Sequence, residues 1–210
     1  TNYVVMAVLN YHRQLPRFQK DKQRKFWNMS NPELEYTVGG IGVEALGYDV
    51  SEKLAMMDFP VVGFGFSEKK DFKYPYYSKN ELPEFLKSVN VVICLLPLTA
   101  ATENILNEAF FSKCTPGTYL INVARGKHLV EEDLIEALDK GQLSGAMLDV
   151  YREEPLPQTH PFWDDSRITM TPHIASVTNP KAAAPQLMEN IKRIKENREV
   201  LNLVDRSKGY

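Results

Sequence analysis

Short apolar segments alternate with helical patterns through most of this 210-residue chain. The segments expected to form strands lie within residues 36–41, 60–64, 91–95, 117–122, 145–148 and 167–170. Helices are expected between several of them, ending at about Met56, over Leu82–Ser88, and from Glu131 to Gly141. Apolar strands that alternate with helices form a parallel sheet covered by helices on both faces. The sequence therefore predicts an α/β fold with a doubly wound parallel sheet, the Rossmann-like dinucleotide-binding architecture.

Residues 1–27 are expected to form a helix that precedes the first strand. Its apolar side chains repeat at helical spacing and are Val4, Val8, Tyr11 and Leu15. Pro16 is expected to interrupt or kink this helix. The basic residues that follow favour a solvated helix face over an anion-binding patch: Arg17, Lys20, Lys22, Arg24 and Lys25.

A last helix is expected to begin at Asn179-Pro180, a capping residue followed by proline at the first helical position. Its apolar stripe consists of Leu187, Ile191 and Ile194. Met56 and Met57 are expected to pack in the core. The chain is thus divided into a first helix (1–28), a dinucleotide-binding domain (29–177), and a returning helix with a polar tail (178–210).

Composition excludes several classes of protein. The net charge is −2, which gives no reason to expect a nucleic-acid partner. No apolar run reaches the roughly 18 residues of a membrane span, and no signal peptide is recognisable. Cys94 and Cys114 do not suggest a disulfide framework, so a reducing cytoplasm is the expected location. The histidines are scattered without metal-ligand spacing; His12, His128 and His160 are expected to be structural or solvated.

The segment Gly42-Val43-Glu44-Ala45-Leu46-Gly47 follows the first strand, where a dinucleotide-binding fold has G-x-G-x-x-G. The first glycine makes the turn, the second admits the pyrophosphate, and the third lets helix pack on strand. Here Glu44 replaces the second glycine. At ~4 Å from a phosphate its charge would cost roughly 1 kcal/mol in water and ~4 kcal/mol at a surface site. The sequence predicts weakened cofactor binding unless this side chain turns outward.

The end of the second strand usually distinguishes NAD from NADP. An acidic residue there binds the ribose hydroxyls of NAD, whereas basic residues meet the 2′-phosphate of NADP. This chain has Gly65-Phe66-Ser67-Glu68-Lys69-Lys70 at that position. Lys69 and Lys70 either meet a phosphate or are solvated, and the sequence slightly favours NADP over NAD.

Three charged residues supply side chains suited to 2-hydroxy acid or 2-keto acid chemistry. Arg125 can hold a carboxylate with its planar guanidinium, His173 can transfer a proton, and Glu154 can hold that histidine. Asn122, Asp149 and Thr171 each follow a predicted strand. Because ligands bind beyond the carboxyl ends of parallel strands, these segments are expected at one edge of the sheet.

The ordered motifs of the chain resemble those of the D-isomer-specific 2-hydroxyacid dehydrogenases. They are Leu96-Pro97-Leu98-Thr99, Asn122-Val123-Ala124-Arg125-Gly126, Ala146-Met147-Leu148-Asp149-Val150, Glu154-Pro155-Leu156 and Thr171-Pro172-His173-Ile174-Ala175. Within that family the chain is most similar to the glyoxylate/hydroxypyruvate reductase A group, whose ending the segment Val204–Tyr210 resembles. The resemblance covers nearly the whole chain.

The resemblance implies a role for each matching position. Arg125 would bind the substrate carboxylate and carbonyl, His173 would be the general acid in reduction, and Glu154 would orient His173. The nicotinamide of the cofactor would supply the hydride. Asp149 is expected either near the nicotinamide or as a strand-end cap. Together with the glycine loop, the expected cofactor-binding residues are Gly42, Val43, Glu44, Leu46, Gly47, Ser67, Leu96, Pro97, Thr99, Val123, Ala124, Asp149 and Ala175.

The resemblance also implies a domain beyond this chain. Family members begin with a substrate-binding domain that precedes the helix at residues 1–28, and that helix region forms their homodimer interface. The returning helix packs on the same domain. Two functions are therefore expected: a reductase of a small 2-keto acid, or a non-catalytic dimerisation or binding module of the same fold, corepressor-like or cofactor-deficient. Binding of NADH or NADPH distinguishes them.

Overall fold

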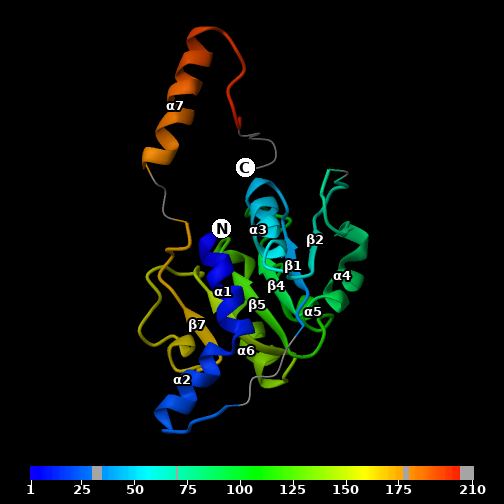
Figure 1. Cartoon of the computed structure of the whole chain (residues 1–210), viewed down its shortest axis with the longest axis vertical. Helices are drawn as coiled ribbons and strands as arrows, with labels where there is room; N and C mark the ends of the chain where they lie inside the picture. Colours follow the sequence, from blue (N-terminus) through cyan, green and yellow to red (C-terminus); the bar gives the residue numbers. More distant parts are fainter. Residues whose placement is uncertain (30–34, 70, 177–179, 204–210) are drawn as a thin grey trace.

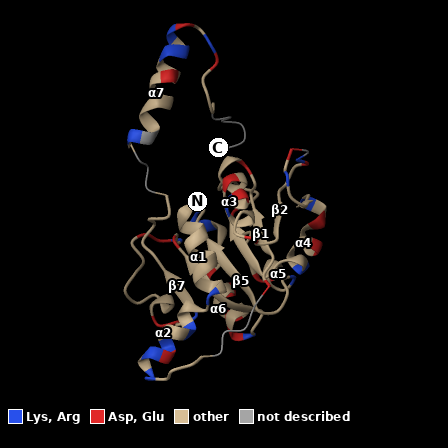
Figure 2. Ribbon diagram, in the orientation of Figure 1, with Lys and Arg blue, Asp and Glu red and all other residues tan. Residues whose placement is uncertain are grey.

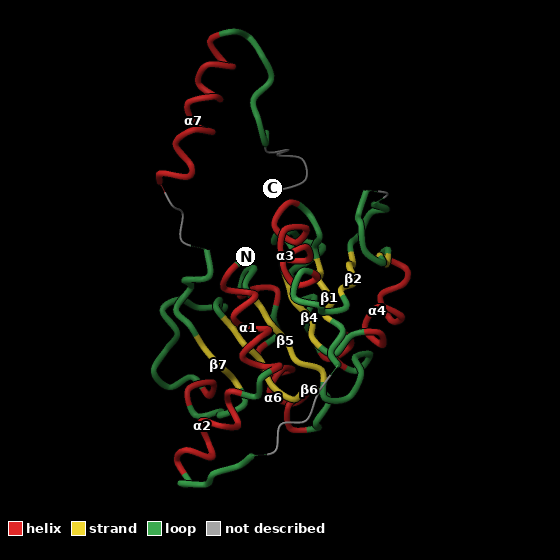
Figure 3. Tube along the Cα trace, viewed as in Figure 1, coloured by secondary structure: helices red, strands yellow, loops and turns green. Residues whose placement is uncertain are grey.

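A computed structural model describes residues 1–29, 35–69, 71–176 and 180–203. Its centre is a parallel sheet of seven strands in the order β3-β2-β1-β4-β5-β6-β7 (Figures 1 and 3). The strands are β1 Val38–Ile41, β2 Val61–Phe64, β3 Tyr76–Tyr77, β4 Val91–Cys94, β5 Thr118–Asn122, β6 Leu143–Leu148 and β7 Ile168–Met170. The predicted α/β fold is confirmed, and all six predicted strands are present.

The chain winds outward from β1 in two directions. β1 pairs with β2 on one side and with β4 on the other, and every recorded pairing is parallel. The direction of winding therefore reverses between β1 and β4, the place where doubly wound sheets open a crevice for a ligand. The seventh strand, β3, was not predicted; it has only two residues and lies at the sheet edge.

Helices cover both faces of the sheet. On one face α1 (Asn2–His12) and α3 (Ala45–Ala55) pack against the strands through Val4, Val8, Val50 and Leu54. On the other face lie α4 (Leu82–Ser88), α5 (Glu108–Phe111) and α6 (Glu131–Asp139). Short 3-10 turns occupy Lys79–Glu81, Gly126–His128 and Pro161–Trp163. The helix α1 thus belongs to the core of the sheet domain.

The first helical segment is interrupted as predicted. α1 ends at His12, Gln14 adopts a left-handed conformation with φ 56°, and α2 (Leu15–Gln23) begins with proline at its second position. Leu15 lies beyond the break and is 41% exposed, so its predicted place on the buried face of the first helix is wrong. The basic side chains on and after α2 gather at one end of the molecule (Figure 2).

The predicted burial of Met56 and Met57 is also wrong. Met56 is 78% exposed and Met57 is 48% exposed, because both follow the last residue of α3, where the chain turns away from the sheet. Leu54, one turn earlier on the packed face, is buried.

The helix α7 (Pro180–Lys195) extends away from the sheet domain (Figure 1). Its predicted stripe of Leu187, Ile191 and Ile194 is exposed. The expected cap at Asn179 and the ending Val204–Tyr210 lie outside the described residues. In the part of the chain that the structure describes, no helix is long and apolar enough to span a bilayer. Over those same ranges, His, Cys, Asp and Glu side chains form no metal-binding group of three or more.

Candidate active site

The predicted site residues lie along the carboxyl edge of the sheet. Gly42 follows β1, Leu96 follows β4, Arg125 follows β5, Asp149 follows β6 and His173 follows β7. Since these strands are parallel and adjacent, the loops after them meet at one edge. The sequence therefore correctly anticipated which segments come together.

Two glycines shape the loop between β1 and α3. Gly42 has φ +89°, and a Cβ added to it would lie 3.0 Å from the backbone carbon of Leu95. A Cβ on Gly47 would lie 2.1 Å from the carbonyl oxygen of Gly42. Both positions therefore need glycine, as the pattern of a dinucleotide-binding loop requires. The intervening Val43 side chain is buried, whereas Leu46 is 48% exposed on the first turn of α3.

Glu44 occupies the position of the usual second glycine without backbone strain, since its φ is −66°. Its side chain is 74% exposed and lies 3.5 Å from Nζ of Lys69. The same ammonium donates a hydrogen bond to the carbonyl oxygen of Val43. Glu44 is thus drawn toward the loop after β2, and a lysine offsets its charge. The outward orientation that the sequence left open is the one observed, and Lys69, expected to meet phosphate or solvent, is instead engaged here.

The loops after β2 and β4 form the sides of this edge. Ser67 is exposed, and its carbonyl oxygen accepts a hydrogen bond from the Tyr76 hydroxyl. Leu96 is buried, whereas Pro97 and Thr99 are partly exposed.

His128, which the sequence marked only as structural or solvated, is fully buried. Its Nε2 lies 3.3 Å from the carbonyl oxygen of Pro97, and its Nδ1 lies 3.0 Å from that of Arg125. Burial lowers the pKa of His128, against the raising effect of these two carbonyls. Burial thus favours the neutral form of this imidazole, which connects the loop after β4 to the loop that carries Arg125.

The Arg125 segment depends on the glycine that follows it. A Cβ on Gly126 would lie 1.8 Å from the carbonyl oxygen of Tyr151, so this turn packs directly on the backbone after β6. The Asn122 amide Nδ2 donates to the carbonyl oxygen of Arg125 at 3.3 Å, and its Oδ1 accepts from the Ala124 amide at 3.2 Å. Val123 is partly exposed, Ala124 is buried, and Arg125 itself is exposed. The packing presents the guanidinium at the surface of the edge.

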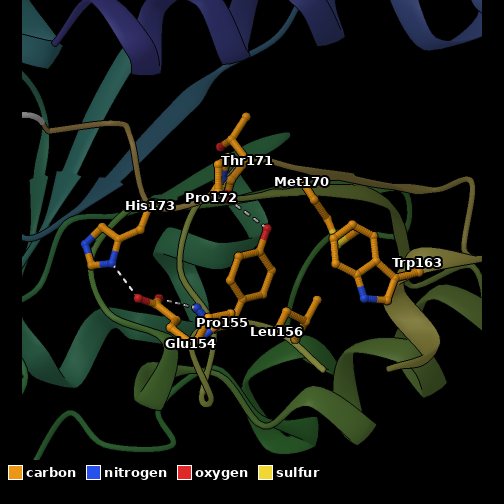
Figure 4. A pocket seen from close by; sticks show the side chains of 9 residues that line it. Glu154, Pro155, Leu156, Trp163, Met170, Thr171, Pro172 and His173 are labelled. Carbon is orange, nitrogen blue, oxygen red and sulfur yellow. Dashed lines mark hydrogen bonds and ion pairs between the residues drawn. The ribbon is translucent and has the colours of Figure 1, made fainter. Parts of the chain in front are cut away.

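Glu154 and His173 form a direct pair. Oε2 of Glu154 lies 2.7 Å from Nδ1 of His173, and Oε1 accepts the Tyr151 amide at 2.9 Å. Partial burial raises the pKa of Glu154, but hydrogen bonds from His173 and Tyr151 and the charge of Arg125 outweigh it and hold the pKa below its ordinary value. Glu154 is therefore kept as a carboxylate, and the other ring nitrogen of His173, Nε2, points away from it (Figure 4).

Asp149 holds the backbone that follows His173. Its carboxylate is buried and accepts hydrogen bonds from the Thr171 hydroxyl at 2.6 Å, the Ile174 amide at 2.8 Å and the Ala175 amide at 2.7 Å. His173 itself has φ 55°, a left-handed conformation that is unfavourable for a residue with a side chain. The hydrogen bonds from the Ile174 and Ala175 amides to Asp149 offset the conformational cost of this turn. Asp149 thus acts as a cap on the His173 turn in this structure.

A cavity of about 570 Å³ opens beside the Glu154–His173 pair (Figure 4). Its lining is mainly apolar and comes from the loop after β6 and from the end of β7: Tyr151, Pro155, Leu156, Trp163, Met170, Thr171 and Pro172. Tyr151, Trp163 and Met170 were not among the predicted site residues. Tyr151 and Met170 each stand three residues before a predicted catalytic residue, Glu154 and His173, whereas Trp163 has no such neighbour.

The residues of the edge fit a dinucleotide. The N-terminus of α3 has no side-chain cap, so its first amides are available for a phosphate. Gly42 and Gly47 bring the backbone of this loop close to β4, and Glu44 is turned toward Lys69. Arg125, Glu154 and His173 lie on the loops after β5, β6 and β7 at the same edge of the sheet.

Comparison with known proteins agrees with this geometry. Residues 5–175 match the family model of the D-isomer specific 2-hydroxyacid dehydrogenase, NAD binding domain. The glyoxylate/hydroxypyruvate reductase A of Yersinia enterocolitica is 41% identical over 211 aligned positions, which cover 99% of this chain and 67% of that protein. The chain thus spans about two thirds of that relative's length.

Solved structures give the same result. A D-isomer specific 2-hydroxyacid dehydrogenase from Xanthobacter autotrophicus Py2, in complex with NADPH and MES, matches with a TM-score of 0.95 and 35% identity, covering 100% of this chain and 88% of that one. An NADPH-dependent glyoxylate/hydroxypyruvate reductase from Sinorhizobium meliloti, in complex with NADP and sulfate, matches with a TM-score of 0.94 and 34% identity, covering 100% and 68%. The chain therefore belongs to the D-isomer specific 2-hydroxyacid dehydrogenase family, whose NAD-binding domain it contains.

Proposed function

We propose that this chain forms the cofactor-binding and proton-transfer part of a reductase that converts a small 2-keto acid, of the glyoxylate or hydroxypyruvate type, to the D-2-hydroxy acid. The main support is the pairing of Glu154 with His173 at 2.7 Å, on the same edge of the sheet as the Gly42–Gly47 loop. The relatives named glyoxylate/hydroxypyruvate reductase A support the same substrate class.

Arg125 is proposed to bind the substrate. Its guanidinium is exposed at the edge and close enough to Glu154 to lower the pKa of that carboxyl. A planar guanidinium can donate two parallel hydrogen bonds to a carboxylate. Arg125 would therefore anchor the carboxylate of the keto acid and polarise the adjacent carbonyl.

His173 is proposed to be the general acid. Its Nδ1 is held by Glu154, which leaves Nε2 to donate a proton to the carbonyl oxygen of the substrate as that oxygen becomes an alkoxide. The hydrogen bond to Glu154 fixes the plane of the imidazole ring. The nicotinamide, when bound, supplies the hydride. In the oxidative direction Nε2 accepts the proton instead.

NADP is the preferred cofactor in this proposal. The supporting relatives were solved with NADPH or NADP. Of the two lysines after β2, Lys69 is engaged by Glu44, and Lys70 lies outside the described residues. The cofactor contacts are proposed to come from the Gly42–Gly47 loop, from Ser67, and from the loops containing Leu96, Pro97, Thr99, Val123, Ala124 and Ala175. Asp149 contributes by holding the turn that ends at Ala175.

The chain is proposed to act with a substrate-binding domain like the one that completes its longer relatives, and as a homodimer. The exposed apolar stripe of α7 suits packing on such a domain. Residues 1–28 would carry the dimer contacts. A cytoplasmic location agrees with two buried cysteines, both of them free, whose thiol pKa burial raises to about 12.

A second candidate is a non-catalytic dimerisation or binding module of the same fold. Glu44 at the phosphate loop and the exposed stripe on α7 favour it. Cofactor binding separates the two. Saturating NADPH should raise the melting temperature of the chain, because a ligand at 100 times its Kd stabilises by about 2.7 kcal/mol. If neither NADPH nor NADH at millimolar concentration shifts the melting temperature, the reductase proposal fails for this chain and the module remains.

A further inference from the structure

The turn that presents His173 is supported from a helix far away in the sequence. Thr171, two residues before His173, has a side-chain oxygen that meets two partners. One is Asp149, which also holds the amides of Ile174 and Ala175. The other is the hydroxyl of Tyr3, on the first turn of α1 and 168 positions away.

The direction of these hydrogen bonds follows from proton counting. Thr171 has one hydroxyl hydrogen and donates it to the Asp149 carboxylate. The contact between Tyr3 and Thr171 therefore needs the hydrogen of Tyr3. Burial raises the pKa of Tyr3, and the nearby Asp149 charge adds to this against the lowering effect of Thr171. The phenol consequently keeps its hydrogen at neutral pH.

We propose that Tyr3 is a positioning residue for His173, acting through a hydrogen-bond chain from its hydroxyl to Thr171, then to Asp149, and from Asp149 to the Ile174 and Ala175 amides. This inference rests on the proposed function for the role of His173, whereas the hydrogen bonds themselves do not depend on that function. Tyr3 makes the Thr171 hydroxyl a stronger donor to Asp149 and fixes its direction, so the carboxylate is held in the orientation in which it accepts from the two amides.

The helix that carries Tyr3, α1, is packed against the sheet. Val4, Ala7 and Val8 of α1 are buried against the sheet, at 3%, 1% and 1% exposure. Tyr3 projects from this packed helix onto the loop after β7, whereas the ring of His173 is held separately by Glu154. The backbone and the ring of His173 are thus fixed by two different carboxylates, and Tyr3 serves the backbone.

The same helix offers a matched control. Tyr11 also lies on α1, and its hydroxyl contacts Oγ of Ser144 at 2.9 Å while its ring stacks on Tyr119 with centroids 4.0 Å apart. Neither contact touches the His173 turn. Tyr3→Phe and Tyr11→Phe remove the same atom from the same helix, but only Tyr3→Phe breaks the hydrogen-bond chain.

The test is amide hydrogen exchange measured by NMR on the 210-residue chain without cofactor or substrate. Tyr3→Phe should speed exchange of the Ile174 and Ala175 amides about fivefold, the equivalent of about 1 kcal/mol for one hydrogen bond. Exchange of the Leu120 amide in β5, which reports global unfolding, should speed by no more than the same factor, because global unfolding breaks the same hydrogen bond. Tyr11→Phe should leave the Ile174 and Ala175 rates unchanged.

Variants of Thr171 supply a second test, which does not require the Tyr3→Phe variant to fold. Thr171→Ser keeps the hydroxyl and should retain the parent exchange rates, whereas Thr171→Val should speed them. Adding Tyr3→Phe to Thr171→Val should have no further effect, since the chain is already cut. Unchanged rates in Tyr3→Phe, or equal rates in the serine and valine variants, would overturn the proposal. Cofactor binding plays no part in this measurement, so its outcome is independent of the proposed reductase activity.

Discussion

Oε2 of Glu154 lies 2.7 Å from Nδ1 of His173, although 19 positions separate the two residues. The contact forms because β6 and β7 are parallel neighbours whose following loops meet at the carboxyl edge of the sheet. It orients the imidazole and commits Nδ1, so that the second ring nitrogen is the one available for proton transfer.

The Glu154 carboxylate should make a pH-dependent contribution to stability. Its pKa in the folded chain lies below its ordinary value of 4.5. The contribution is therefore complete above that value and is lost as pH falls through the lower folded-state pKa. Because the side chain is 35% exposed, the effect should be small, about 0.5 kcal/mol. Urea unfolding between about pH 3 and pH 7 should show the parent and Glu154→Gln converging in acid. A difference that grows as pH falls would contradict the assignment.

Glu44 should weaken cofactor binding only modestly, because it is paired with Lys69 and exposed. Glu44→Gln removes the charge, and Glu44→Gly removes the side chain as well. Each should tighten NADPH binding by about tenfold or less, as expected for charges in a solvated setting. Lys69→Ala leaves Glu44 uncompensated and should weaken binding. Titration calorimetry measures all three, and equal affinities for the parent and every variant would show that Glu44 lies too far from the phosphates to matter.

Gly126→Ala should destabilise the fold. The added Cβ would lie 1.8 Å from the carbonyl oxygen of Tyr151, so backbone must move. The expected loss in the free energy of unfolding is at least about 2 kcal/mol. Gly40→Ala is the control, since its Cβ would lie 3.8 Å from the nearest side-chain atom of Val43. That variant should cost less than about 1 kcal/mol. Similar losses for both variants would exclude the close approach at Gly126 as the cause.

The sheet could be predicted because six of its strands are apolar and separated by helices. β3 and α5, with two and four residues, are too short for periodicity to reveal. Met56 and Met57 continue the apolar pattern past the end of α3, and composition alone does not show where the helix leaves the sheet.

The site was only partly predictable for a related reason. The order of strands places Arg125, Glu154 and His173 at one edge, which a sequence can indicate. Glu44 pairs with Lys69, 25 positions away, and Tyr3 of α1 pairs with Thr171, 168 positions away. Both pairings depend on the directions in which the side chains point. No local pattern encodes such contacts.

The proposed reaction is tested most directly by the turnover of His173→Ala. The variant should be compared with the parent protein, with glyoxylate as substrate and NADPH oxidation followed by absorbance. Loss of the general acid should lower kcat by about 10²–10⁴-fold, while the Kd for NADPH stays within about twofold because His173 is not part of the phosphate loop. Turnover close to that of the parent enzyme would contradict the role of His173 and, with it, the proposed mechanism.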